Sequence, residues 1–191
     1  MSATVDITES LTFAAVRAYL QSILPTGVEI VKAQQNGVPE PTSADHVVLT
    51  PITRERLSTN IEVYQDNTGG SYRYAVTPTN FSIQADIYGP NSSDYSQIVR
   101  TLWRDRNATD YFGSLTIGAL TGNATITTLF NGAPLHASDP KQLVFINGAD
   151  VYEPRWSVDL ALQVNPTITT AQQFAASLVV DLISVDAKYP A

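Results

Sequence analysis

Two histidines, His46 and His136, are the first residues whose chemistry could point to a function. Asp45 precedes one of them and Asp139 follows the other by three residues, so either pair could begin a metal site. Zinc sites, however, normally use three or four ligands, and the chain has no cysteine. We therefore assign no metal ligand. A hydrolase that uses His46 or His136 stays open as an alternative, because a serine–histidine–acid triad is recognised by geometry and not by spacing.

The segment Tyr-Glu-Pro-Arg-Trp at 152–156 could be the wall of an active site or a structural corner. Trp156 begins an alternation of apolar and polar residues over 156–164, which predicts a strand with Trp156 on its buried side. The proline precedes that strand, where a missing N–H costs least. Glu153 and Arg155 flank the proline and can pair with other charges. The segment is therefore predicted to be a corner where a long loop enters a core strand.

No sequence motif indicates a cofactor or a catalytic residue. The chain lacks the GxSxG, GxxxxGK[ST], HExxH and GxGxxG patterns. Its net charge of −7 argues against a protein that grips nucleic acid, since such affinity depends on neutralising phosphates. No apolar run approaches the roughly 18 residues of a membrane span, and no basic leader is present, so we expect no membrane partner.

Two amphipathic helices are predicted to support a sheet. The first spans 7–24, where Asp6 and Glu9 resemble a capping box and Pro25 ends the helix. The second spans about 93–106, with its apolar residues on one stripe. Arg100, Arg104 and Arg106 gather toward its carboxyl end, where they form either a solvated face that suits the helix dipole or a contact for a phosphate or an acidic partner.

The remaining segments favour a mostly antiparallel or mixed sheet with long extended loops. Strands are predicted at 28–32, at 46–52, within a hairpin over 60–89 that turns near Asn67, at 156–164 and at 178–185. Residues 113–155 are punctuated by glycine and proline and are predicted to be weakly structured. The chain is thus predicted to be one α+β domain over 1–191.

Within that loop region, the short apolar run Leu143–Ile146 needs a surface to cover it. We therefore expect Leu143, Phe145 or Ile146 to contact another chain. A third possibility is a monomeric binding module that uses a tyrosine-rich surface, whose residues are Tyr72, Tyr74, Tyr88 and Tyr95.

Four segments of the chain resemble phage neck or tail terminator proteins. They are RLSTNIEVY (56–64), IYGPNSSDYSQIVRTLWRD (87–105), PLHASDPKQLVFINGADVYEPRW (134–156) and NPTITTAQQFAASLVVDLISVD (165–186). They occur in the family's order, and the second long segment, 134–156, is the most specific.

The resemblance implies an α+β virion structural protein that is assembled in the bacterial cytoplasm. Such proteins form a ring, commonly a hexamer, that caps the tail tube and joins it to neck or connector proteins below the capsid. The tail sheath is a further partner where the tail is contractile, and DNA passes through the lumen without specific binding. The resemblance supplies no catalytic residue and no cofactor.

Overall fold

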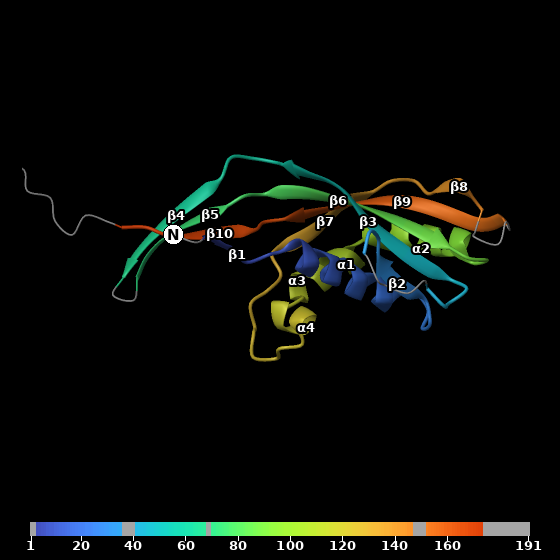
Figure 1. The fold of residues 1–191 in the computed structure, drawn as a ribbon, viewed down its shortest axis with the longest axis horizontal. Coiled ribbons are helices and arrows are strands. Elements are labelled where there is room, and N and C mark those ends of the chain that lie inside the picture. The colour runs from blue at the N-terminus through green and yellow to red at the C-terminus, as the bar shows by residue number, and fades with distance from the viewer. Residues whose placement is uncertain (1–2, 36–40, 68–69, 147–151, 174–191) are drawn as a thin grey trace, which may run out of the picture.

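The computed structural model of the chain describes residues 3–35, 41–67, 70–146 and 152–173 (Figure 1). The elements in chain order are β1 (Ala3–Val5), α1 (Glu9–Ile23), β2 (Glu29–Lys32), β3 (His46–Arg56), β4 (Ile61–Asn67), β5 (Gly70–Val76), β6 (Thr79–Tyr88), α2 (Ser92–Trp103), α3 (Arg106–Ser114), α4 (Ile117–Thr121), β7 (Gly132–Ala137), β8 (Lys141–Ile146), β9 (Tyr152–Val164) and β10 (Thr167–Ala171).

The larger sheet holds the centre of the molecule. Its strand order is β2-β3-β6-β9-β7, and β8 pairs with β9 on the same side as β7. Only β2 and β3 are parallel, and the other pairs are antiparallel. The predicted mixed α+β sheet is therefore confirmed.

A smaller four-stranded sheet, with the order β1-β10-β5-β4, extends from one end of the larger one. Its strands β4, β5 and β10 directly follow or precede β3, β6 and β9 along the chain, and they keep the same neighbours. Backbone hydrogen bonds continue across the bend, from Leu57 N–H to Pro78 O at 2.9 Å and from Thr77 N–H to Pro166 O at 3.1 Å. Three strands thus run through the body into a projecting arm, seen at the left of Figure 1. We call β1, β4, β5 and β10 the arm.

The helices lie together on one face of the larger sheet (Figure 1). The strands present alternate residues to them, and Phe81, Ile83, Ala85 and Ile87 are all buried as the alternation predicted. Burial of this apolar layer is the main source of the body's stability.

An aromatic cluster joins the helices to one another. Tyr19 of α1 packs edge-on against Trp103 of α2 and is tilted against Phe112 of α3. The Tyr19 hydroxyl donates to Leu102 O at 3.0 Å, and burial raises the Tyr19 pKa to about 12, with a further contribution from Asp105.

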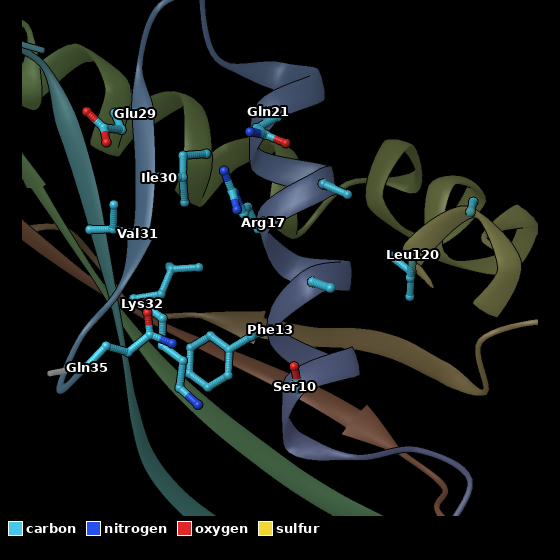
Figure 2. A pocket seen from close by; sticks show the side chains of 14 residues that line it. Ser10, Phe13, Arg17, Gln21, Glu29, Ile30, Val31, Lys32, Gln35 and Leu120 are labelled. Atoms are coloured by element: carbon cyan, nitrogen blue, oxygen red, sulfur yellow. The ribbon is translucent and has the colours of Figure 1, made fainter. Parts of the chain in front are cut away.

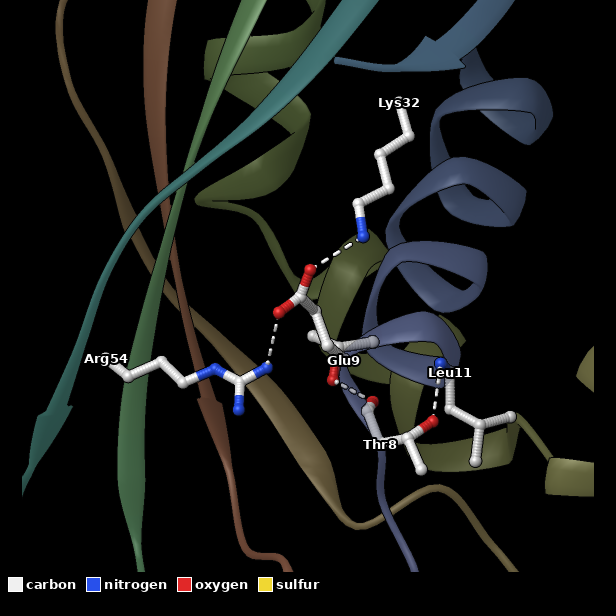
Figure 3. Close-up of polar contacts among 6 residues, drawn as sticks. Thr8, Glu9, Leu11, Lys32 and Arg54 are labelled. Atoms are coloured by element: carbon white, nitrogen blue, oxygen red, sulfur yellow. Dashed lines mark hydrogen bonds and ion pairs between the residues drawn. The ribbon is translucent and has the colours of Figure 1, made fainter. Parts of the chain in front are cut away.

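The helix ends differ from the predicted ones because other side chains cap them. Thr8, and not Asp6, is the N-cap of α1, and its hydroxyl accepts from Leu11 N–H at 3.2 Å. Glu9 in the first turn pairs with Lys32 and Arg54 (Figure 3). The second predicted helix corresponds to α2, which ends at Trp103, and Asp105 then caps a further helix that was not predicted, α3, by accepting from Arg106 N–H.

Residues 113–155 differ most from the predicted structure. This region was expected to be weakly structured, but the described part contains α4, β7, β8 and the start of β9. The predicted strand at 178–185 lies outside the described residues. The strand that follows Pro166 is instead β10 in the arm, which was not predicted.

Candidate assembly interface

An exposed apolar surface covers the end of the larger sheet that lies farthest from the arm. Val144 of β8 and Tyr152 of β9 have 84% and 75% of their surface exposed, and Leu143 and Ile146 are also exposed. The amino terminus of α2 reaches β9 here, where Ser92 Oγ is 3.5 Å from Pro154 O, but it leaves these side chains exposed. By register, Val144, Ile146 and Tyr152 share one face of the sheet, whereas Leu143 lies on the opposite face with Phe145. We call Val144, Ile146 and Tyr152 the β8–β9 patch.

Phe145, which lies between Val144 and Ile146 in β8, packs against the larger sheet. Its ring packs edge-on against the Tyr88 ring at 5.1 Å between centroids, and the Tyr88 ring also stacks on the His46 ring at 4.8 Å. Burial is the main cause of the raised pKa of Tyr88. The row anchors β8 to the central strands, so Phe145 is only partly free to contact a partner.

A buried ion pair lies beside this aromatic row. Arg155 Nη2 is 2.8 Å from Asp86 Oδ2, and Gln84 Nε2 donates to both carboxylate oxygens of Asp86. Burial acts to lower the pKa of Arg155, but the hydrogen bond and charge of Asp86 outweigh it, so the net pKa is raised. The pairing of Arg155 with another charge, which the sequence predicted, is confirmed.

The predicted corner at 152–156 is wrong in its geometry. These residues form the first five positions of β9 and are paired with β8. Pro154 lies one residue beyond the last pair between β6 and β9, so no partner there requires its missing N–H. Trp156 has the predicted phase, opposite Ile87, but its side chain is only half-buried. Glu153 is also half-buried, opposite Phe145.

Arg100 and Arg104 of α2, the two candidate interface arginines, have different surroundings. Arg100 Nη2 is 2.6 Å from Asp139 Oδ1, which ties α2 to the turn before β8. Arg104 is exposed at the carboxyl end of α2 and makes no ion pair among the described residues. Of the two, only Arg104 is free for a partner.

The two histidines do not come together. His46 is opposite Tyr88, whose partner on β9 is Arg155, whereas His136 is opposite Ala161 on β9. Six residues of strand separate these rows, which is roughly 20 Å. The described residues contain no group of three histidines or carboxylates that could hold a metal ion.

The four tyrosines of the binding-module alternative are dispersed. Tyr72 and Tyr74 lie on the arm, Tyr88 is in the larger sheet, and Tyr95 on α2 packs against the core. They do not form one surface.

The arm is a second exposed surface, and sequence reasoning did not identify it. By register, Ile61, Val63, Tyr72, Tyr74 and Val76 share one face of it. Ile61 and Val63 have 58% and 51% of their surface exposed. We call these five residues the arm face.

The opposite side of the arm carries the ion pair between Arg73 and Glu62, together with exposed Val5 and Ile168. The hairpin itself was predictable from the sequence, but its lack of a covering helix was not. Two features of the sequence could have indicated an exposed arm. Ile61 and Val63 alternate with polar residues, and no third amphipathic helix was predicted to pack on them.

Two exposed apolar surfaces thus lie at opposite ends of the described chain. The chain belongs to the phage neck terminator protein family, whose model matches residues 11–187. The suspected family is thereby confirmed, and with it a structural role in head–tail joining and a place in the tail or neck of the virion. No curated protein matches the chain. Among the described residues, no helix is long and apolar enough to cross a membrane.

Proposed function

We propose that six copies of this chain form a ring that caps the tail tube and joins it to the neck or connector proteins. The tail sheath would contact the same ring in a contractile tail, and DNA would pass through the lumen. The observation that carries the proposal is the pair of apolar surfaces, the arm face and the β8–β9 patch, at opposite ends of one continuous ribbon of strands.

Two different surfaces on one chain favour a ring over a simple dimer. If the arm face of one subunit packs on the β8–β9 patch of the next, every contact is head-to-tail, and such contacts close into a ring when the rotation between subunits divides a full turn. A two-fold dimer would instead make both contacts with the same single partner and leave neither surface free for a third chain. Six is the number that the resemblance to terminator proteins implies.

The charge of the chain suits a passage for DNA. Six chains of net charge −7 carry roughly −42 formal charges. Phosphates gain no counterion release from an acidic surface, so DNA would slide past without adhering.

The test uses one aspartate at each surface. Val63→Asp disables the arm face and Val144→Asp disables the β8–β9 patch, and both side chains are exposed enough for the fold to accept the charge. Each variant alone should remain monomeric by light scattering. An equal mixture should form a heterodimer, because the intact arm face of the Val144→Asp chain can pack on the intact patch of the Val63→Asp chain. Assembly should stop at two chains, because the two remaining surfaces are both disabled.

Thr101→Asp, on the exposed side of α2, is the control and should assemble like the unmodified chain. Electron microscopy of the unmodified chain with tail tubes should show a ring at one end of each tube. Homodimers of either variant, or a mixture that stays monomeric while the control assembles, would contradict head-to-tail contact between these surfaces.

A further inference from the structure

A groove of about 590 Å³ runs between α1 and the edge strand β2 (Figure 2). Its lining combines apolar side chains from α1, β2, β3 and α4, among them Phe13, Ile30, Leu49 and Leu120. Figure 2 shows the Arg17 side chain in the space between α1 and Ile30. The groove lies away from the arm face and the β8–β9 patch.

One wall of the groove is an unpaired strand edge. β2 ends the order of the larger sheet, and its only strand partner among the described residues is β3. Ala33 N–H donates to Leu49 O on the β3 side, so by alternation the N–H and C=O groups of Ile30 and Lys32 point to the opposite edge. An extended segment could therefore add to β2 through backbone hydrogen bonds.

The other wall, α1, carries a cation that is free for a partner, Arg17. The second cation of the groove, Lys32 of β2, is already paired with Glu9 at 2.6 Å and lies over the Phe13 ring at 4.5 Å. Arg17 is exposed and forms no ion pair within the described part of the chain. The chemistry of the groove thus favours an extended apolar segment that carries a carboxylate.

The chain contains such a segment outside the described residues. Residues 178–185 read Leu-Val-Val-Asp-Leu-Ile-Ser-Val, so Val179, Asp181 and Ile183 fall on one side of an extended chain. Alternate strand residues are spaced by about 6.6 Å. Residues four apart on a helix are about 6 Å apart. An apolar–acidic–apolar row can therefore follow α1, with Asp181 at Arg17.

The position of β10 favours a groove on another copy. β10 runs away from the body, and the last described backbone contact, from Gln172 N–H to Ser71 O at 2.9 Å, lies near the tip of the arm. Five residue steps lead from Gln173, the last described residue, to Leu178, and they span at most about 18 Å when extended. To reach the groove of its own subunit, the chain would have to reverse along the whole arm.

We propose that residues 178–185 of one subunit add as a strand to β2 of a neighbouring subunit, with Asp181 paired to Arg17. The proposal rests on the ring proposed above and adds a second link between its subunits. The link uses backbone pairing and one ion pair, whereas the contact between the arm face and the β8–β9 patch is apolar.

Disulfide trapping tests the proposal on the full chain, which has no cysteine of its own. Val31→Cys is placed on β2, and single cysteines are placed at 179, 180, 181, 182 and 183 in separate chains. Each is mixed with the Val31→Cys chain and oxidised. We expect cross-linked dimers between the two variants at alternate positions only, since side chains of one parity share a face with Val31.

A charge exchange tests the ion pair. Arg17→Glu should lower the trapped fraction about two- to fivefold, the range of an exposed pair, and Asp181→Arg in the partner chain should restore it. Arg56→Glu makes the same change of charge on another exposed arginine that forms no ion pair among the described residues, and it should have no effect.

Light scattering on the same samples separates this proposal from the ring. Assembled particles without mixed dimers at any position would overturn the added strand and leave the ring intact. A double variant, Val31→Cys with Leu182→Cys, that closes only within its own chain would also overturn it, because the segment would then occupy its own groove. Absence of any assembled species would overturn the ring itself.

Discussion

The two tryptophans, Trp103 and Trp156, differ in how deeply their side chains are buried. Trp103 is 1% exposed, packs edge-on against Tyr19 and Phe112, and donates its indole N–H to Ala161 O at 3.2 Å. Trp156 has an inward phase, opposite Ile87, but it lies near the start of β9 and its side chain is only half-buried. The alternation identified its side of the sheet and could not identify how far the helices reach.

We therefore expect different losses of stability from the two truncations. Trp103→Ala should reduce the free energy of unfolding by about 3–5 kcal/mol, because it leaves a cavity and an unpaired carbonyl. Trp156→Ala should cost only about 1–2 kcal/mol, since much of its surface is already in water. Chemical denaturation measures both. Equal losses would show that Trp156 is covered as deeply as Trp103.

The histidines give a second prediction at this scale. The double variant His46→Ala, His136→Ala should assemble and yield infectious particles, because neither residue is assigned a chemical role. His46→Ala removes the stack on Tyr88 and should cost about 1 kcal/mol of stability. His136→Ala, in an exposed position on β7, serves as the comparison. Folded double-variant protein without infectivity would revive the hydrolase alternative.

Among the elements, α1 depends on charges at its amino terminus. Glu9 lies in the first turn, and its pKa is lowered chiefly by the hydrogen bond from Lys32, against a smaller opposing effect of burial. Because the pKa in the folded chain is below the ordinary value, this contribution to stability is complete above pH 4.5 and is lost as the pH falls through the folded pKa.

Glu9→Gln should accordingly reduce stability at pH 7 by about 0.5 kcal/mol, a value kept small by the exposure of the pair. The difference from the unmodified chain should shrink as the pH falls below 4.5. Glu55→Gln removes an exposed carboxylate outside any described ion pair and controls for the change in net charge. A difference that stays constant from pH 7 to pH 3 would exclude the ion pair as its source.

The segment 131–153 gives a prediction at the same scale. Its described part pairs with β9, yet the β8–β9 patch stays exposed, so protection by a partner should be measurable. Limited proteolysis should cleave near the patch in the free subunit and spare it in the assembled tail. Phe145→Asp should also block assembly, at some cost to the packing on Tyr88. Equal resistance to cleavage in both states would place the interface elsewhere.

Sequence patterns predicted those elements whose residues are either clearly buried or clearly solvated. The strand at 156–164 and the hairpin of β4 and β5 were found because their side chains alternate. β7 and β8 were missed because edge strands here expose both sides, as at Leu135 and Val144, and carry no alternation. The apolar run of β8 was nevertheless recognised as a candidate interface, since it lacked a place in the predicted core.

At the scale of the whole molecule, the acidic charge leads to a prediction about DNA. The chain carries 18 acidic and 11 basic side chains, which is too few cations for a phosphate-binding surface. Fluorescence anisotropy with duplex DNA at roughly 0.15 M salt should show binding weaker than about 10⁻⁴ M, the weak end of ordinary non-specific affinity. Tighter binding that weakens steeply with salt would mean that a basic surface forms on assembly.

The passage of β3, β6 and β9 into the arm has a mechanical consequence. A pull along the arm reaches the body along the strand direction, so the hydrogen bonds between neighbouring strands are sheared together. A pull across the strands at β8 would peel its six pairs with β9 one after another. We therefore expect the chain to resist a pull along the ribbon axis best and to yield first where β8 can be separated from the edge of β9.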